Sequence, residues 1–312
     1  LDTWPVQGKS AFVVGASSVD LPTGNHTIQI GTGGSYMISV ASDGGVSVVN
    51  GVSALGGAAS LQFNTVSVNF EVGEYPGGWH VSGGYPGAMR AGNFTSMLVP
   101  GVSYKVFVGT VGSFLFNLNQ AGAVTSQNLA AAFGGQNLLR FNAVSVSIDV
   151  GDYPGSWHIA SGHPGVMRQG NFNSILVPGI SYKVAIGIIG SFQFNLNDIG
   201  VITSQNTAAA SGGQNFLRFN TVAINIDVKN YPGSWHIASA HPGAMRQGNF
   251  TSLLVPGISY RVAIGAIGTV QIDVDSAGKV VSQNAIAATG GANSLSLNTV
   301  EIDIKPETFM GG

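Results

Sequence analysis

Most of the residues that could bind a ligand or a metal lie in a short segment that occurs three times. The sequence Tyr-Pro-Gly-x-Trp-His begins at Tyr75, Tyr153 and Tyr231, with a constant spacing of 78 residues. The segments around these copies hold three of the four tryptophans and five of the six histidines of the chain. Such a concentration in a loop is typical of a binding or catalytic site.

The residue types in these segments are those that hold sugars. An indole can stack on a sugar ring, while imidazole, guanidinium and amide groups bind its hydroxyls. The sequence therefore predicts a secreted, multivalent, lectin-like protein whose partners are glycans or glycoconjugates, because several weak sites gain avidity together. The predicted ligand-binding residues are Trp79, His80, Arg90, Asn93, Trp157, His158, His163, Arg168, Asn171, Trp235, His236, His241, Arg246 and Asn249.

A packing role for the same residues is an open alternative. Each tryptophan could pack one repeat against the next, and each arginine could pair with Glu71, Asp149 or Asp227.

A metal site is the second functional hypothesis. His80, His158 and His236 occupy equivalent positions, and Asp2 is the residue in phase with them in the fourth copy. Three imidazoles and one carboxylate around a common axis could hold one transition-metal ion with a position open for substrate. The protein would then be a metal-dependent enzyme; under the lectin hypothesis it has no cofactor.

The sequence does not decide whether the protein is an enzyme. It contains no Gly-x-Ser-x-Gly motif, no phosphate-binding loop and no calcium-loop pattern. The chain has 12 Lys and Arg, 14 Asp and Glu, and a formal net charge of −2. Because no basic cluster is present, nucleic acid is not expected as a partner. Because apolar residues alternate with polar ones, membrane insertion is not expected either.

The repeat also predicts the architecture. A diverged fourth copy precedes the other three, and four copies of 78 residues account for all 312. One copy of the Tyr-Pro-Gly segment would then be divided between the two chain ends, as in propellers whose last blade is shared. We therefore expect an all-β fold in which four antiparallel units close into a four-fold, propeller-like ring. The alternative is a linear tandem array of small β-sandwich units.

Alternating apolar and polar residues indicate the strands. Val144, Val146, Ile148 and Val150 alternate with Ser145, Ser147 and Asp149, which is typical of a strand with one buried face. The predicted strand units of this single repeat domain cover residues 18–72, 96–150, 174–228 and 252–306. The predicted connecting segments are 73–95, 151–173 and 229–251, with a fourth divided between 307–312 and 1–17.

Composition favours an extracellular location. The chain has no cysteine, only 8% charged residues, many Gly, Ser and Asn residues, and Asn-x-Ser/Thr sequons at Asn25, Asn93 and Asn249. Leu1 in place of an initiator Met suggests a processed or excised chain. A third hypothesis is therefore a structural extracellular β-repeat protein, in which exposed β edges support self-assembly into a fibre or surface layer.

Overall fold

The fold is all-β. The computed structural model describes residues 3–4, 13–14, 18–30, 34–49, 54–82, 87–266 and 268–303. Within these ranges the regular structure consists of strands alone, arranged as repeating, mostly antiparallel sheets.

Unit 3, which covers residues 144–219, shows the architecture most completely. One sheet has the order β18-β16-β23-β22 and the other has the order β17-β19-β20-β21. The opening strand β16 pairs antiparallel with β18 and parallel with β23, so it lies in the middle of its sheet. The strands of unit 3 are β16 (Val144–Asp149), β17 (Trp157–Ile159), β18 (Phe172–Leu176), β19 (Ile180–Ile186), β20 (Gly190–Leu196), β21 (Ile202–Ser204), β22 (Ala210–Gly213) and β23 (Phe216–Phe219).

Units 2 and 4 repeat this arrangement strand for strand. Unit 2 comprises β8 (Val66–Glu71), β9 (Trp79–Ser82), β10 (Phe94–Leu98), β11 (Val102–Val108), β12 (Gly112–Leu118), β13 (Val124–Ser126), β14 (Ala132–Gly135) and β15 (Leu138–Phe141). Unit 4 comprises β24 (Val222–Asp227), β25 (Trp235–Ile237), β26 (Phe250–Leu254), β27 (Ile258–Ile264), β28 (Gly268–Val274), β29 (Val280–Ser282), β30 (Ala288–Gly291) and β31 (Ser294–Leu297).

Unit 1 is described less fully. Its described strands form a three-stranded sheet, β3-β4-β5, and two pairs, β1-β2 and β6-β7. They are β1 (Thr3–Trp4), β2 (Val13–Val14), β3 (Gly24–Ile30), β4 (Gly34–Val40), β5 (Val46–Val48), β6 (Ala54–Gly57) and β7 (Ser60–Phe63).

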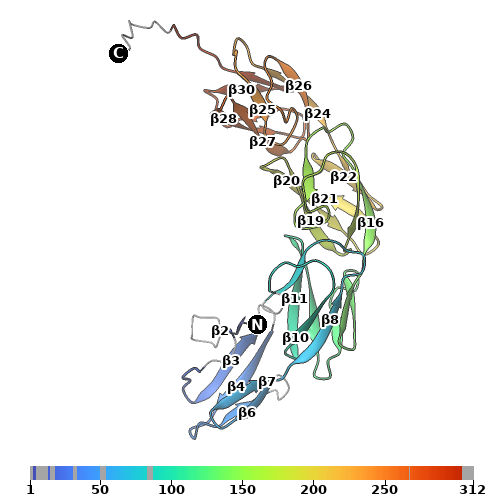
Figure 1. The fold of residues 1–312 in the computed structure, drawn as a ribbon, viewed down its shortest axis with the longest axis vertical. Helices are drawn as coiled ribbons and strands as arrows, with labels where there is room; N and C mark the ends of the chain where they lie inside the picture. The colour runs from blue at the N-terminus through green and yellow to red at the C-terminus, as the bar shows by residue number, and fades with distance from the viewer. Residues whose placement is uncertain are drawn as a thin grey trace, which may run out of the picture.

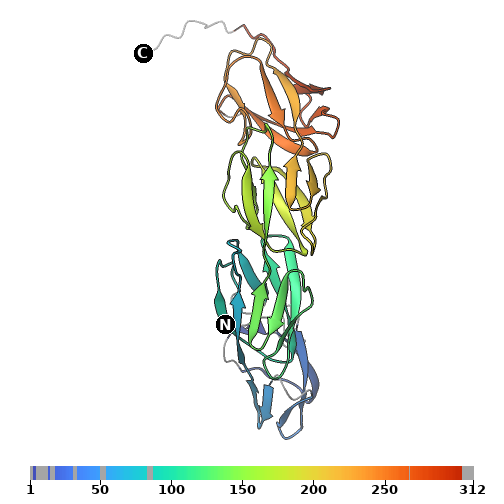
Figure 2. The same cartoon turned by 90° about the vertical axis from the view of Figure 1, so that its right-hand side faces the viewer.

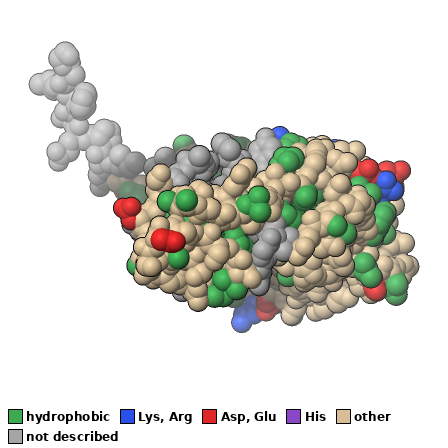
Figure 3. Space-filling view, turned by 90° about the horizontal axis from the view of Figure 1, so that it is seen from below, with side chains coloured by type: hydrophobic (Ala, Val, Ile, Leu, Met, Phe, Trp, Pro, Cys, Tyr) green, Lys and Arg blue, Asp and Glu red, His purple; other side chains and the backbone are tan. Residues whose placement is uncertain are grey.

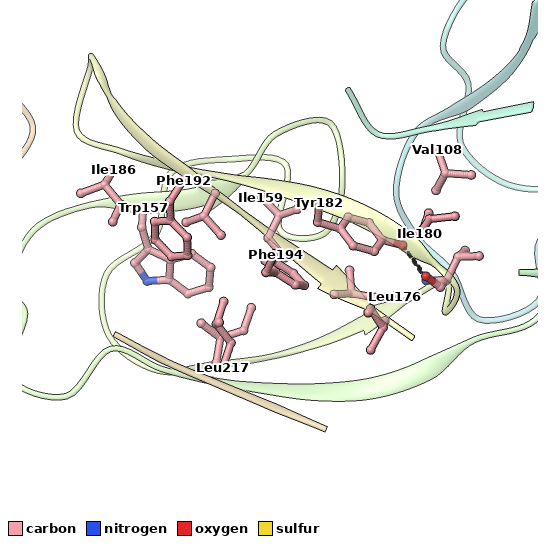
Figure 4. Packing of buried hydrophobic residues seen from close by; sticks show 14 of the residues in the cluster. Val108, Trp157, Ile159, Leu176, Ile180, Tyr182, Ile186, Phe192, Phe194 and Leu217 are labelled. Carbon is pink, nitrogen blue, oxygen red and sulfur yellow. Dashed lines mark hydrogen bonds between the residues drawn. The ribbon is translucent and has the colours of Figure 1, made fainter. Parts of the chain in front are cut away.

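Alternation along the strands builds the apolar layer between the two sheets of a unit. In β16, Val146 and Ile148 are fully buried while Ser145 and Ser147 are exposed, as the sequence predicts. Side chains from the facing sheet, including Tyr182 and Phe194, complete the apolar layer (Figure 4). Its aromatic and β-branched residues suit the half-buried surface of a sheet.

Asparagines that recur just before each long strand bond to main-chain carbonyl groups of the preceding loop. The Nδ2 group of Asn220 donates hydrogen bonds to the carbonyl oxygens of Thr207 and Ala208, both at 2.9 Å. Asn142 and Asn298 make the equivalent pairs of bonds in units 2 and 4.

The units follow one another in an open, curved array (Figures 1 and 2). Unit 4, the last described unit, lies at the end of the array farthest from unit 1 (Figure 1). The predicted closed ring is therefore wrong, and the linear alternative fits the repeating sheets. The physical reason is that each unit contacts the next at one end only, so successive units extend the array.

Sheet pairing also places the unit boundaries in a different phase from the predicted segments. The long strand expected at the end of a unit, such as β16, pairs with strands that follow it in the chain. The predicted connecting segment 151–173 consequently lies inside unit 3 and contains β17. The fourth predicted connection, 307–312 with 1–17, lies outside the described residues except for β1 and β2.

Candidate functional site

The repeated Tyr-Pro-Gly-x-Trp-His segment links the two sheets of each unit. In unit 3 it leaves β16, passes Tyr153 and enters β17, which forms the edge of the second sheet. Because side chains alternate along β17, Trp157 and Ile159 point into the core while His158 points outward.

The tryptophans fill the core. Trp79, Trp157 and Trp235 are all 0% exposed. The Trp157 ring meets Phe219 edge to face at 5.7 Å, and its Nε1 donates a hydrogen bond of 3.0 Å to the Gly170 carbonyl. A fully buried indole cannot stack on a sugar, so the predicted role of these tryptophans as ligand platforms is corrected to a packing role. They pack within their own unit, not between units.

The outward-facing histidines contact a methionine. His158 Nδ1 lies 2.8 Å from Met167 Sδ, and the same contact joins His80 to Met89 at 2.9 Å. Burial lowers the pKa of His158 from its ordinary value of 6.5. Met167 is 42% exposed, so this pair is accessible to solvent. His236 and Met245 make the equivalent pair in unit 4.

The repeated arginines pack over aromatic rings. The guanidinium of Arg168 lies 4.3 Å from the centre of the Phe172 ring, and the same geometry recurs at Arg246 and Phe250. Main-chain hydrogen bonds also join Arg168 to Trp157 in both directions, at 2.8 Å each.

The acids expected to pair with these arginines have other partners. Asp149 lies 3.4 Å from Arg218, Asp227 lies 2.9 Å from Lys229, and Glu71 pairs with Arg140. The predicted pairing with the segment arginines is therefore wrong. The parallel alignment of opening and closing strands decides the outcome, because it places Asp149 opposite Arg218 and Glu71 opposite Arg140.

The segment asparagines tie the loop to the opening strand. Asn171 Oδ1 accepts a hydrogen bond of 2.8 Å from the main-chain N–H of Val150. Asn93 and Asn249 accept equivalent bonds of 2.9 Å from Val72 and Val228. Of the predicted ligand-binding residues, the asparagines thus use their side-chain oxygen within the fold.

The imidazole rings of His163 and His241 each pack on a phenylalanine ring. The imidazole of His163 packs on Phe172 with ring centroids 5.1 Å apart. The main-chain carbonyl of His163 accepts a hydrogen bond from the Ser174 hydroxyl. Its Nδ1 is buried without a hydrogen-bond partner among the described residues. Burial, followed by the charge of Arg168, lowers its pKa from 6.5, and burial and Arg246 act in the same way on His241.

These histidines predict a loss of stability in mild acid. A lowered folded-state pKa means that the unfolded chain binds protons more readily, so stability is complete above about pH 6.5 and declines as pH falls below it. The double variant His163→Gln/His241→Gln should show a smaller fall in melting temperature between neutral pH and about pH 5. Thermal melts of both proteins across this range test the prediction. Parallel pH profiles would contradict it.

The predicted axial metal site does not form. His80, His158 and His236 lie on β9, β17 and β25 of three successive units, and an open array has no axis on which they converge. Asp2 lies outside the described residues. Among those that are described, no group of three His, Cys, Asp or Glu side chains is placed to hold a metal ion.

Hydrogen bonds between neighbouring units were not predicted from the sequence. Gly78 N donates to Ser161 O at 2.9 Å, and Asn128 Nδ2 donates to Gly179 O at 2.8 Å. The same bonds recur one unit later, from Ser156 to Ser239 and from Asn206 to Gly257. The recurrence of Asn at positions 128, 206 and 284 was a signal, but periodicity alone cannot show that the side chain reaches into the next unit.

The chain was compared with protein-family models, curated proteins and solved structures. No protein-family model matches it, and no curated protein matches it. A structural similarity is found to the crystal structure of the pilus adhesin SpaC from Lactobacillus rhamnosus GG, with 9% sequence identity and a TM-score of 0.20. The alignment covers 88% of this chain but only 47% of the adhesin chain.

On the face shown in Figure 3, charged side chains are few and scattered among uncharged atoms. In the described part of the chain, there is no helix with the length and apolar character that a membrane span requires.

Proposed function

We propose that this chain is an extracellular structural protein in which successive β units form a stiff rod, of the kind that serves as a stalk or as the subunit of a fibre or surface layer. The observation that supports this role most directly is the interface between units, which recurs with the same residues between units 2 and 3 and between units 3 and 4. A repeated interface fixes the angle between neighbours and so makes an extended shape persistent.

The interface combines apolar burial with main-chain hydrogen bonds. Val108 and Ile186, at the ends of β11 and β19, are both 0% exposed. Ile180 lies against the hairpin of unit 2, where a Cβ added at Gly112 would be 2.7 Å from its Cδ1 atom. Glycine is needed at position 112 because the backbones of units 2 and 3 approach each other closely there. Such contacts resist bending more than a flexible linker would.

The lectin hypothesis stays a prediction, but fewer of the residues on which it depended are available to bind a ligand. The indoles on which it depended are buried, and the segment asparagines are bonded to the main chain. No geometric observation favours glycans over other partners, and no group for a metal-dependent reaction is assembled among the described residues.

The interface predicts a rod in solution. A compact globule of this length would have a radius of gyration of about 20 Å, and we expect a clearly larger value from small-angle X-ray scattering at low protein concentration. A compact scattering profile would overturn the proposed function.

The inter-unit amides supply a matched test of stiffness. In the double variant Asn128→Asp/Asn206→Asp, Oδ1 still accepts the turn bonds from Ala131 and Ala209, but the donors to Gly179 and Gly257 are lost. Each substitution should lower the free energy of unfolding by about 1–3 kcal/mol, because a carbonyl is left unpaired beside a carboxylate. Scattering should then show a more flexible array, and a thermal melt should show a lower melting temperature.

Asn284→Asp is the matched control for this test. Asn284 Oδ1 also accepts turn bonds, from the main-chain N–H groups of Ile286 and Ala287, but no further described unit receives a bond from its Nδ2 group. We expect its scattering profile and melting temperature to match those of the parent. Equal effects at all three positions would show that the turn, and not the interface, is responsible.

A further inference from the structure

Units 2, 3 and 4 each place an imidazole nitrogen against a thioether sulfur at the outer surface. In every unit the histidine Nδ1 atom lies 2.8 or 2.9 Å from the methionine Sδ atom. The hydrogen bonds between units described above use other residues, so these contacts have no part in joining the array. We call them the His–Met pairs: His80 with Met89, His158 with Met167, and His236 with Met245.

The backbone brings each His–Met pair together. Trp157 and Arg168 form an antiparallel bridge, with main-chain hydrogen bonds of 2.8 Å in both directions. In an antiparallel pair the next residue of one segment faces the preceding residue of the other, so His158 lies opposite Met167. The same bridge recurs in units 2 and 4, at Trp79 with Arg90 and at Trp235 with Arg246. One backbone geometry, present in three units, therefore produces the same pair three times.

The His–Met pairs face solvent. Met89 is 41% exposed, Met167 is 42% exposed and Met245 is 47% exposed. Because Trp157 points into the core, its neighbour His158 points away from the core. A dissolved ion can therefore approach the pair without any opening of the fold.

The positive charge next to each methionine is held elsewhere. Arg168 follows Met167 directly, but its guanidinium packs over the Phe172 ring, 4.3 Å from the ring centre. Successive side chains of an extended segment point to opposite sides, so this charge is not aimed at the His–Met pair. The arginines of the other units pack in the same way: Arg90 over Phe94 and Arg246 over Phe250.

An imidazole and a thioether together form a soft set of ligands. Thioether sulfur favours Cu(I), whereas Ca²⁺ and Mg²⁺ take oxygen ligands and structural zinc sites are closed by further protein ligands. In the part of the chain that the structure describes, no three His, Cys, Asp or Glu side chains are grouped so as to hold a metal. The pairs therefore lack the ligands that zinc or calcium needs and offer two that suit a monovalent ion of low coordination number.

Binding requires only a small movement of the methionine. With bonds of about 2.0 Å to nitrogen and about 2.3 Å to sulfur, as at zinc sites, two ligands on opposite sides of an ion stand about 4.3 Å apart. The sulfur would thus have to move outward by about 1.5 Å from its present contact with Nδ1. Methionine has three rotatable bonds and adapts readily, and the side chain of each pair is partly exposed, so this movement is available.

We propose that each His–Met pair binds one soft monovalent metal ion of the Cu(I) class, through Nδ1 of the histidine and Sδ of the methionine. The array then carries such sites at intervals of one unit. The proposal goes beyond the structural function and does not depend on it, because it needs only the local geometry of a single unit.

Silver ion is the probe for these sites, because Ag(I) shares the soft, monovalent character of Cu(I) and is stable in air. Equilibrium dialysis of the full chain in chloride-free buffer, followed by elemental analysis, should show one bound ion for each His–Met pair. Zinc and calcium ions under the same conditions should not bind at these residues. Zinc bound as tightly as silver would overturn the assignment to a soft ion, and no bound silver would overturn the site itself.

The methyl signals of the methionines locate the bound ion. In protein labelled with carbon-13 at the methionine methyl groups, Ag(I) should shift the signals of Met89, Met167 and Met245. Met37 and Met97 are also exposed, at 40% and 53%, but no described histidine makes the same contact with their sulfur atoms, so they are the internal control. Equal shifts at all five methionines would show binding to any exposed thioether and overturn the proposal.

Substitutions separate the contributions of the two ligands. Replacing the three paired methionines by leucine keeps a similar side-chain volume and removes the sulfur, and should weaken Ag(I) binding by about 10-fold or more. Replacing the three paired histidines by glutamine should have an effect of similar size. Thermal melts check that both variants are folded. The variants are Met89→Leu/Met167→Leu/Met245→Leu and His80→Gln/His158→Gln/His236→Gln.

The matched control is the double variant Met37→Leu/Met97→Leu, which removes two exposed thioethers outside the pairs. It should bind Ag(I) as the parent does. Unchanged binding after loss of the paired histidines would overturn the proposal, and so would a loss in the control as large as that in the variant without paired methionines.

Discussion

Replacing Trp157 by alanine is expected to lower the free energy of unfolding of unit 3 by about 3–5 kcal/mol, the range for truncating a large buried aromatic side chain. The indole is fully buried, packs against Phe219 and donates its N–H to Gly170. Truncation leaves both a cavity and an unpaired carbonyl. Because unit stability is a sum of local terms and neighbour interfaces, units 2 and 4 should be affected less.

Calorimetry and limited proteolysis of the variant test this expectation. Trp157→Ala should show an early transition or cleavage within residues 144–219, while Trp157→Phe should recover part of the loss because an aromatic ring still fills the site. The lectin hypothesis predicts the opposite, a stable fold with reduced glycan binding. An unchanged melting profile for Trp157→Ala would contradict the packing role.

Replacing Gly212 by alanine is expected to destabilise unit 3 by about 3 kcal/mol, at the upper end of the usual cost of overpacking. A Cβ at this position would overlap the Ile202 carbonyl oxygen and lie 2.6 Å from its carbonyl carbon. The obstacle is backbone, so no side chain can rotate away. Strands β21 and β22 would have to separate at the corner where the chain passes from one sheet to the other.

The neighbouring substitution Ser211→Ala is the matched control for Gly212→Ala. Ser211 lies on the same strand and is exposed, so its replacement should change the free energy of unfolding by less than about 0.5 kcal/mol. Chemical denaturation of the two variants and the parent gives the comparison. Equal stability of Gly212→Ala and Ser211→Ala would show that the strands can part without cost. Gly56, Gly134 and Gly290 make the same approach in the other units, so the effect should recur there.

The sequence identified the segment in which the candidate residues lie, but it did not reveal what those residues do. The sequence pointed to the segment around Trp157, His158 and Arg168, and the structure does bring Trp157 and Arg168 together through paired main-chain bonds. Burial could not be predicted from residue type, because an indole suits a ligand platform and a core equally well. The pairing of β17 with β19 decides which side chains face the core, so Trp157 points inward and His158 points outward.

Local pattern determined the strands and the repeat, because alternation of apolar and polar residues is a property of neighbours along the chain. The row Val144, Val146 and Ile148 could therefore be recognised as a buried strand face from the sequence. The direction in which one unit adds to the next was decided by tertiary structure. It depends on contacts such as Asn128 with Gly179, between residues far apart in sequence, so a period of 78 is compatible with either a ring or a rod. Geometry at the unit ends, where main-chain groups of two units bond directly, selects the open array.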